Sequence, residues 1–483
     1  MPRRILVMQL ARLGDLVQTW PLIRRLRHSY PGARISLLAD QRLQELQALG
    51  PPVDEFWGLN FLELAKKTQA ELPAAYDYAQ NLLGDLRSRS FDLVFNLNFS
   101  RSALLLTYLL GVPAKGYRPV AGGREFFRDP WLALVYSLVH ARPFNRLHLT
   151  DVFRHLAPPP ALEPEFPQPF PGRGEPVIAL QLATRHPKRT WPLKHFTRLA
   201  ALLSDRLGAR LWLFGSEAER PLGEKLTGAL PPSQRSRVVN LQGRTSLKEL
   251  GERLKEAHLL ISGDTGTLHL ATHLGVRTVA LFLGPASCFE TGPYGAGHYV
   301  LQAEPPCHPC LEAGDSCAEP ICLEMLPPES VAHLIFALWD EAPFPTGGAL
   351  PANTRIYRTC LEPFGVDYEA LGDAPPRFAD LVGQAYRRAG AGLLKYPLSP
   401  PAPLSQHPGA AIWEALESLL ATLKNGANPV GITPPVAAAL KPLWAYRAEL
   451  ARQSPWAEGD NAAQDLFQQM KSAFTAQLEN WVT

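Results

Sequence analysis

Two glycine–aspartate pairs stand where apolar stretches of this sequence give way to helix-like stretches. The first lies in LARLGD (10–15) and ends at Asp15; the second lies in ISGDTGTLHL (261–270) and ends at Asp264. Glycine permits a tight turn, and the helix that follows presents free N–H groups and a partial positive charge to a phosphate. A carboxylate at such a joint can act as a general base toward a hydroxyl group. Each aspartate equally suits a helix N-cap, which leaves both interpretations open at this point.

The second joint holds several other polar side chains near the same helix start. Thr265 and Thr267 are of types that cap helices, Gly263 and Gly266 suit a close turn, and His269 falls in the first helical turn. We expect this segment either to bind the phosphates or sugar hydroxyls of a ligand, or to be a well-capped helix without one.

Charged residues follow two other strand-like stretches. In ATRHPKRTWPLKHF (183–196), Lys188 and Arg189 precede a predicted helix start at Trp191-Pro192, where cations suit a diphosphate. In LFGSEAER (213–220), Glu219 suits the hydroxyls of a ribose or another sugar. Taken alone, these residues are more typical of exposed charges and of an acid in a first helical turn.

Alternating strand-like and helix-like segments position all of these joints. The predicted strands are RILVMQL (4–10), ARISLLAD (33–40), FDLVFNLN (91–98), residues 112–117, PVIALQL (176–182), ARLWLFG (209–215), RVVNLQG (237–243), LLISGD (259–264) and RTVALFLG (277–284). Strands that alternate with helices predict βαβ units and mainly parallel sheets. Ligands of such sheets bind outside the carboxyl ends of the strands, where both Gly-Asp joints fall.

A proline-rich stretch, PPPALEPEFPQPFPGRGEP (158–176), interrupts this alternation, since neither a helix nor an inner strand tolerates so many prolines. We therefore predict one Rossmann-like domain at 1–160, a linker at 161–176 and a second Rossmann-like domain at 177–344. The remainder, 345–483, has helical periodicity in stretches such as AAIWEALESLLATL, and is predicted to be a mostly helical appendage with a recruitment or assembly role.

Composition limits the class of protein. The 483 residues are 46% hydrophobic and 19% charged, which is typical of a globular chain, and no apolar run is long enough to predict a membrane span. Six cysteines without a secretion signal indicate a reducing, cytoplasmic setting. Residues 1–160 carry 20 Lys/Arg against 13 Asp/Glu, which favours an anionic partner or membrane surface as much as an incidental bias. No Lys/Arg cluster interleaved with aromatics predicts nucleic-acid binding.

Four of the cysteines form a cluster, CHPCLEAGDSCAEPIC (307–322), with C-x2-C-x6-C-x4-C spacing. Four thiolates at this spacing can hold a structural zinc, so Cys307, Cys310, Cys317 and Cys322 are weak zinc candidates. Free thiols or a redox-sensitive pair are the more frequent alternative.

Taken together and in order, these segments resemble glycosyltransferase family 9, the ADP-heptose:lipopolysaccharide heptosyltransferases and their relatives. The resemblance covers roughly residues 3–340. It is carried by ILVMQLARLGDLVQTWPLIRRLRHSYPGARISLL, FDLVFNLNFSRSALLLTYLLGVPAKGYR, the R-T-W-P helix start, LFGSEAER, VVNLQGRTSLKEL and ISGDTGTLHLATHLGVRTVALFLGP. It implies an α/β GT-B fold, in which two Rossmann-like domains with parallel sheets face each other. The first would be the acceptor domain and the second the nucleotide-sugar domain.

The resemblance also implies an inverting, metal-independent transfer of a sugar without a cofactor. Its base would be Asp15, and the diphosphate contact would be Arg189, where relatives usually carry lysine, with Lys188 sharing the role. The sugar and phosphates would meet Glu219, Asp264, Thr265, Gly266, Thr267 and His269. The donor that the resemblance implies is a nucleotide sugar, ADP-heptose, and the implied acceptor is an anionic glycolipid of the lipopolysaccharide type or another glycan. Peripheral association with the inner face of the inner membrane would follow.

Two other functions share many of these features. A nucleotide-sugar epimerase has the same two-domain fold but needs no acceptor site, and the Gly-Asp joint of the first domain argues against it. A non-catalytic glycan-binding or assembly protein is the second alternative, which the arginine at position 189 keeps open.

Overall fold

The computed structural model describes residues 2–70, 72–119, 126–127, 129–159, 175–311, 317, 320–342, 350–372, 377–396, 441, 442 and 445. None of the helices in these ranges is both long and apolar enough to cross a membrane. The chain divides into two compact units. The first comprises Met1–Phe126, His148–Leu361 and Val366–Asp373, and the second comprises Phe127–Leu147, Glu362–Gly365 and Ala374–Thr483.

The first unit holds two sheets, and the N-terminal one contains five parallel strands. These are β1 (Arg4–Gln9), β2 (Arg34–Asp40), β3 (Glu55–Leu59), β4 (Leu93–Asn96) and β5 (Ala114–Gly116), in the order β3-β2-β1-β4-β5. The central strand β1 buries Ile5 to Met8 completely, as expected of a parallel strand covered on both faces. The order is that of a Rossmann-like domain, whose ligands bind where the strand order reverses beside β1.

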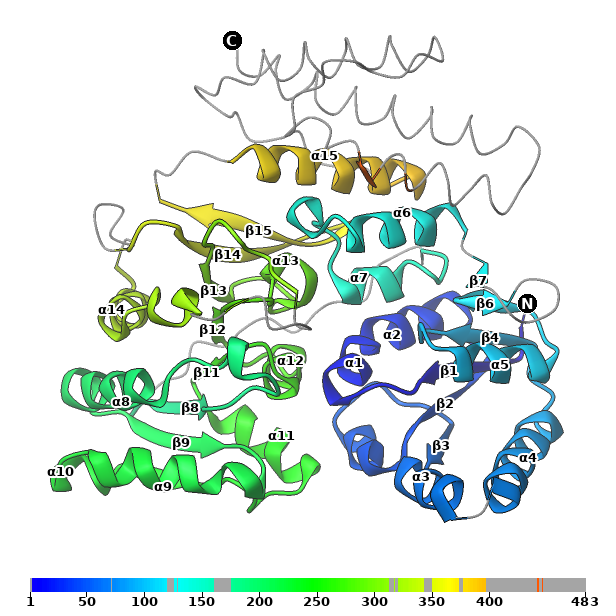
Figure 1. Ribbon diagram of the computed structural model, residues 1–483, viewed down its shortest axis with the longest axis horizontal. Coiled ribbons are helices and arrows are strands. Elements are labelled where there is room, and N and C mark those ends of the chain that lie inside the picture. The colour runs from blue at the N-terminus through cyan, green and yellow to red at the C-terminus, as the bar shows by residue number, and fades with distance from the viewer. Residues whose placement is uncertain are drawn as a thin grey trace, which may run out of the picture. The chain divides into compact units, whose positions relative to one another are not determined.

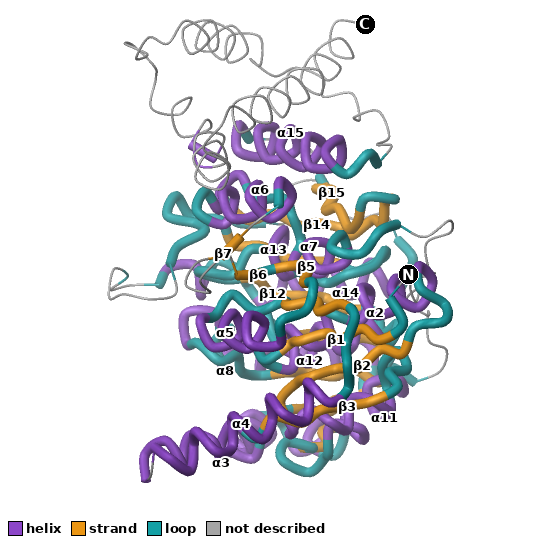
Figure 2. The backbone as a smooth tube through the Cα atoms, turned by 90° about the vertical axis from the view of Figure 1, so that its right-hand side faces the viewer, coloured by secondary structure: helices purple, strands orange, loops and turns teal. Residues whose placement is uncertain are grey.

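Short helices follow the strands of this sheet. They are α1 (Leu13–Gln18), α2 (Trp20–Ser29), η1 (Gln41–Ala48), α3 (Phe61–Ala70), α4 (Leu72–Ser88), α5 (Arg101–Leu110) and α7 (Leu149–Arg154). The short strands β6 (Arg118–Pro119) and β7 (Phe126–Phe127) come after β5. Figure 2 shows α3 and α4 extending away from β3 at the edge of the sheet.

The second sheet has eight strands in the order β10-β9-β8-β11-β12-β13-β14-β15. The strands are β8 (Val177–Gln181), β9 (Arg210–Phe214), β10 (Val238–Asn240), β11 (Leu259–Ser262), β12 (Thr278–Phe282), β13 (Tyr299–Ala303), β14 (Thr354–Glu362) and β15 (Gly365–Leu371). From β10 to β13 the pairs are parallel and repeat the Rossmann-like order, whereas β14 pairs antiparallel with β13. The structure therefore has the α/β GT-B arrangement with two Rossmann-like sheets (Figure 1).

The helices of this half are η3 (Pro187–Arg189), α8 (Leu193–Leu207), η4 (Glu217–Glu219), α9 (Arg220–Ala229), α10 (Pro232–Arg235), α11 (Leu247–Glu256), α12 (Gly266–His273), α13 (Cys288–Thr291), η5 (Ile321–Glu324) and α14 (Pro328–Trp339). Helix α8 shows how the sequence specifies them. Phe196, Leu199, Ala200 and Leu203 recur at helical spacing and are buried in the core. The helix ends at Gly208, whose φ of 61° is the left-handed conformation that favours glycine.

The helical character expected from residue 345 onward begins later than the sequence suggested. Residues 354–362 and 365–371 are strands β14 and β15, and Ile356, Tyr357 and Val366 are buried within the first unit. The alternation in TRIYRTCLEPFGVDYEAL is a strand pattern that the surrounding Ala, Leu and Pro content obscured. Most of the predicted linker, and AAIWEALESLLATL with the other helical stretches of 397–483, lie outside the described residues. The boundaries of the two domains, the linker and the appendage, at residues 160, 176 and 344, therefore remain predictions.

The second unit contains α6 (Pro130–Val139), η2 (Arg142–Phe144) and α15 (Phe378–Leu393) in its described part. Arg146 contacts Asp380 at 2.7 Å, and Arg387 contacts Glu362 at 2.7 Å while lying over the ring of Phe364. The Arg146–Asp380 ion pair thus joins segments of this unit that are 234 residues apart in sequence.

Candidate active site

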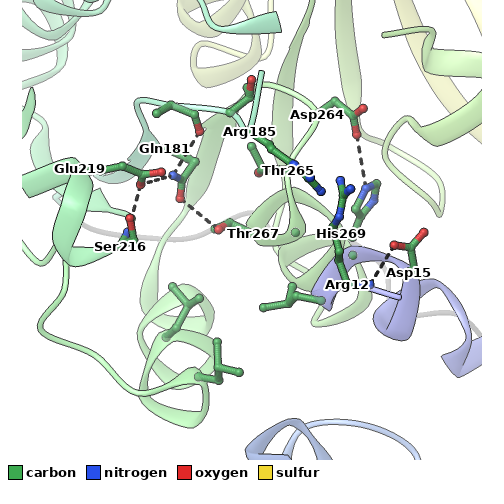
Figure 3. A pocket seen from close by; sticks show the side chains of 18 of the residues that line it. Arg12, Asp15, Gln181, Arg185, Ser216, Glu219, Asp264, Thr265, Thr267 and His269 are labelled. Atoms are coloured by element: carbon green, nitrogen blue, oxygen red, sulfur yellow. Dashed lines mark hydrogen bonds and ion pairs between the residues drawn. The ribbon is translucent and has the colours of Figure 1, made fainter. Parts of the chain in front are cut away.

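A pocket of about 670 Å³ lies at the carboxyl ends of strands from both sheets. Residues 12–15 and Gln18 of the N-terminal half line one side, and the other side is formed by residues that follow β8, β9, β10 and β11. Figure 3 shows Asp15 beside His269 and Asp264 at one end of this pocket, and Gln181 and Glu219 at the other end. The volume lies within the usual range of pockets for small molecules and cofactors.

Asp15 lies in the first turn of α1. Its Oδ2 atom accepts a hydrogen bond from the backbone N–H of Arg12 at 3.1 Å, so that it caps the helix as well as facing the pocket. Burial raises the pKa of Asp15; His269 acts in the opposite direction, and the negative charge of Asp264 adds to the rise. A carboxylate with a raised pKa is a stronger base, which suits proton abstraction from a hydroxyl group.

Asp264 forms the centre of an ionic cluster at the end of β11. Its Oδ2 atom lies 2.6 Å from Nη1 of Arg189, and its Oδ1 atom lies 3.5 Å from Nε2 of His269. Burial alone would raise the pKa of Asp264, but His269 and Arg189 outweigh it and hold this pKa below its ordinary value. The side chain of Asp264 is therefore a carboxylate that is already paired, and it orients both Arg189 and His269 at the pocket.

The N-terminus of α12 opens into the same pocket. Thr265 is the N-cap, and its Oγ1 atom accepts a hydrogen bond from the N–H of Leu268 at 3.2 Å. Gly266 and Thr267 form the first turn, and both line the pocket. The free N–H groups of this turn and the helix dipole favour a negatively charged group.

Within the second half, a chain of polar contacts links the first turn of α12, the end of β8 and the turn after β9 (Figure 3). Thr267 donates to Oε1 of Gln181 at 3.0 Å, Nε2 of Gln181 donates to Glu219 at 3.1 Å, and Glu219 also accepts from the N–H of Ser216 at 3.0 Å. These contacts hold the Glu219 carboxylate beside the pocket, where it can accept hydrogen bonds from sugar hydroxyls.

The two predicted cations differ in position. Arg189 lines the pocket, whereas Lys188 does not, and the carbonyl oxygen of Lys188 packs against Gly284 instead. Arg185, three residues before Lys188, is exposed and does line the pocket. The sequence placed these residues in one basic cluster but gave no signal of which side chains face inward.

The sequence did not indicate Arg12 and Gln181 as pocket residues, nor Gly243, Thr245 and Ser246 between β10 and α11 and Leu247 and Leu250 in the first turn of α11. Gln181 is the last residue of β8, so its place at the carboxyl edge of the sheet was the available signal.

The four clustered cysteines lie outside this pocket. Cys307 is exposed, Cys310 and Cys317 are half-buried, and Cys322 is buried. Burial and the neighbouring thiols raise the pKa of both Cys310 and Cys322. Within the described residues, no group of three or more His, Cys, Asp or Glu side chains is arranged to hold a metal ion.

Two Rossmann-like sheets with a pocket between their carboxyl edges are the arrangement of the GT-B fold, and comparison with known proteins gives the family. The sequence model of glycosyltransferase family 9 (heptosyltransferase) matches residues 80–320. Lipopolysaccharide heptosyltransferase 1 of Pseudomonas aeruginosa is 24% identical over 372 residues, which span 69% of this chain and 98% of that protein.

Solved structures show the same fold. The glycosyl transferase family 9 protein from Veillonella parvula superposes with a TM-score of 0.53 at 18% identity, covering 70% of this chain and 98% of that one. The E. coli ADP-heptose LPS heptosyltransferase II superposes with a TM-score of 0.50 at 21% identity, covering 70% and 99%. The chain belongs to glycosyltransferase family 9, and it is an enzyme of the glycosyltransferase class.

Proposed function

We propose that this enzyme transfers heptose from ADP-heptose to a hydroxyl group of a lipopolysaccharide-type acceptor, with inversion at the anomeric carbon and without a metal ion. The observation that carries this proposal is the position of Asp15. It lines the same pocket as Asp264, His269 and Arg189, which belong to the other half, and burial raises its pKa. The similarity to heptosyltransferases supports the choice of sugar.

In this mechanism the acceptor hydroxyl enters on the side of Asp15. The Asp15 carboxylate takes the hydroxyl proton while the oxygen attacks the anomeric carbon from the face opposite the diphosphate. The bond from the anomeric carbon to the diphosphate oxygen breaks, and ADP leaves with its electron pair. Attack from the opposite face accounts for the inversion.

Negative charge develops on the departing diphosphate, and this pocket supplies positive charge in fixed positions. Arg189, Arg185 and the N-terminus of α12 all lie along the same side. Preorganised charges of this kind lower the barrier because they need not reorganise as the reaction proceeds. Arg189 is held in place by Asp264 and lines the pocket. Lys188 does not line the pocket, so we assign it at most a minor role. Glu219 and the residues between β10 and α11 would hold the nucleoside.

The acceptor side has the properties of a surface for an anionic amphiphile. The loop after β4 is tied to the joint before Asp15, because the N–H of Leu10 donates to Asn98 at 2.7 Å. Next to Asn98, Phe99 is exposed, and Arg101, Leu105 and Tyr108 repeat along one face of α5 and are exposed as well. A cation followed by apolar side chains suits a phosphorylated glycolipid at a membrane surface. We therefore propose peripheral contact with the cytoplasmic face of the inner membrane.

The experiment is a donor comparison followed by product analysis. The enzyme would be incubated with ADP-heptose, UDP-glucose or UDP-N-acetylglucosamine, with and without a lipopolysaccharide-core acceptor, and both released nucleotide and acceptor mass would be measured. We expect ADP release from ADP-heptose that depends on the acceptor, and a mass gain of one heptose. Conversion of a nucleotide sugar to its epimer without an acceptor would instead identify an epimerase.

A further inference from the structure

Helices α1 and α12 belong to opposite halves of the first unit, and their first turns meet beside the pocket (Figure 1). A Cβ atom at Gly14 would lie 2.8 Å from Cδ2 of His269 and 3.6 Å from Cα of Gly266. A Cβ atom at Gly266 would lie 2.5 Å from Cδ2 of Leu13 and 3.3 Å from its Cβ atom. Each glycine thus leaves the room that a residue of the other half occupies.

Backbone conformation does not explain either glycine. Neither Gly14 nor Gly266 is among the glycines with positive φ, and both lie within helices. An alanine would adopt the same backbone without strain and would favour the helix. What requires glycine at both positions is therefore the close approach of the opposite helix.

We propose that Gly14 and Gly266 are positioning residues, which set the distance at which the two domains close and so place Asp15 against His269 and Asp264. This inference rests on the proposed function of Asp15 as the base. Asp15 directly follows Gly14, so any displacement of α1 moves the carboxylate with it.

His269 cannot easily make room for a larger residue. Its ring is buried, and its Nε2 atom lies 3.5 Å from Asp264. A methyl group at position 14 would therefore push α1 outward rather than turn the ring. Leu13 is a flexible side chain, so a methyl group at position 266 should have a smaller effect.

Other contacts between the same two halves lie away from these glycines. Oε2 of Glu45 accepts a hydrogen bond from the N–H of Leu247 at 3.0 Å, at the start of α11. Asp151 of α7 accepts hydrogen bonds from the hydroxyl of Tyr294 at 2.6 Å and from the N–H of Val366 at 3.1 Å. These contacts would keep the halves together in a Gly14 variant, so its effect should stay local to the pocket.

The test compares Gly14→Ala with Gly84→Ala, a control in α4 of the same half whose added Cβ would meet nothing within 4 Å. For Gly14→Ala we expect kcat to fall about 100-fold, the loss typical of a displacement near 1 Å. ADP affinity by calorimetry should stay within about twofold, because the donor-side groups belong to the other half. Gly84→Ala should change neither quantity.

A second pair of variants tests the contact itself. Gly266→Ala should lower kcat, and Leu13→Ala added to it should recover part of the loss, because the atoms that meet the new methyl group are gone. This pair also decides the matter if Gly14→Ala fails to fold. If Leu13→Ala gives no recovery, the loss in Gly266→Ala does not come from the contact with Leu13, which would overturn the inference.

Hydrogen exchange of the α1 and α12 amides gives a readout that does not need turnover. We expect the amides of both helices to exchange faster in Gly14→Ala than in the wild type, and at the wild-type rate in Gly84→Ala. This expectation holds even if the wild-type enzyme proves to use another sugar. Unchanged kcat and unchanged exchange in Gly14→Ala would overturn the inference. So would a loss of ADP affinity as large as the loss of kcat, since Gly14 would then belong to the donor site.

Discussion

Replacing Arg189 with alanine would remove one partner of a buried ion pair in the pocket. The Arg189 and Asp264 side chains are only 15% and 10% exposed, and their charged atoms lie 2.6 Å apart. Loss of one partner from a buried pair costs about 3–5 kcal/mol, because the other charge stays buried without compensation. His269 remains 3.5 Å from Asp264, so we expect a loss in unfolding free energy at the lower end of this range, about 3 kcal/mol.

The chain offers a matched control for this variant. Arg198 and Glu329 form an ion pair of 2.8 Å, but their side chains are 57% and 50% exposed. Such surface pairs contribute less than about 1 kcal/mol. Differential scanning calorimetry should therefore show a fall in Tm of about 5–10 °C for Arg189→Ala and at most about 2–3 °C for Arg198→Ala.

The difference in Tm between the wild type and Arg189→Ala should also depend on pH. The pKa of Asp264 in the folded protein is held below 3.8, so its pairing stabilises the fold above the unfolded-state pKa and is lost as the pH falls through the folded-state value. The gap in Tm between wild type and Arg189→Ala should thus be full at pH 7 and shrink below pH 3.8. Calorimetric titration with ADP should show binding about 10- to 100-fold weaker in Arg189→Ala. Equal Tm losses in the two variants would refute the account of this pair.

Three further predictions follow from the same structure. Asp15→Asn should raise Tm at pH 7, because burial raises the folded-state pKa of Asp15 and folding therefore disfavours its charge. This gain in Tm should vanish below pH 3.8, and a lower Tm at pH 7 would contradict the prediction. Deletion of 397–483 should leave the ADP affinity unchanged by calorimetry, whereas deletion from residue 350 should unfold the second domain, because it removes β14 and β15 from the sheet. EDTA should leave the transfer rate intact, since protein groups carry the charge on the leaving side; a strict requirement for added Mg²⁺ would argue against this.

The arrangement of the site follows largely from one rule about parallel sheets. Asp15, Glu219 and Asp264 all follow strands, and the carboxyl ends of parallel strands meet at one edge, so the sequence could predict that they converge. The two Rossmann-like sheets were predictable for the same reason, because buried parallel strands appear as short apolar runs between helical stretches.

Other features depend on contacts that local sequence does not encode. Arg185 and Lys188 stand in one basic stretch, and only the turn of the chain at η3 decides which of them reaches the pocket. The strands β14 and β15 complete a sheet that begins more than 100 residues earlier, and α6 is grouped with α15 across a similar span. Such long-range pairing leaves little trace in any short window of sequence.

The most direct test of the central proposal is a single-turnover reaction of the wild-type enzyme and Asp15→Asn with ADP-heptose and a lipopolysaccharide-core acceptor, followed by mass spectrometry of the acceptor. The account predicts that the wild-type acceptor gains one heptose. It predicts that Asp15→Asn binds ADP-heptose with similar affinity but transfers about 10²- to 10⁴-fold more slowly. Transfer by Asp15→Asn at the wild-type rate would contradict the assignment of Asp15 as the base.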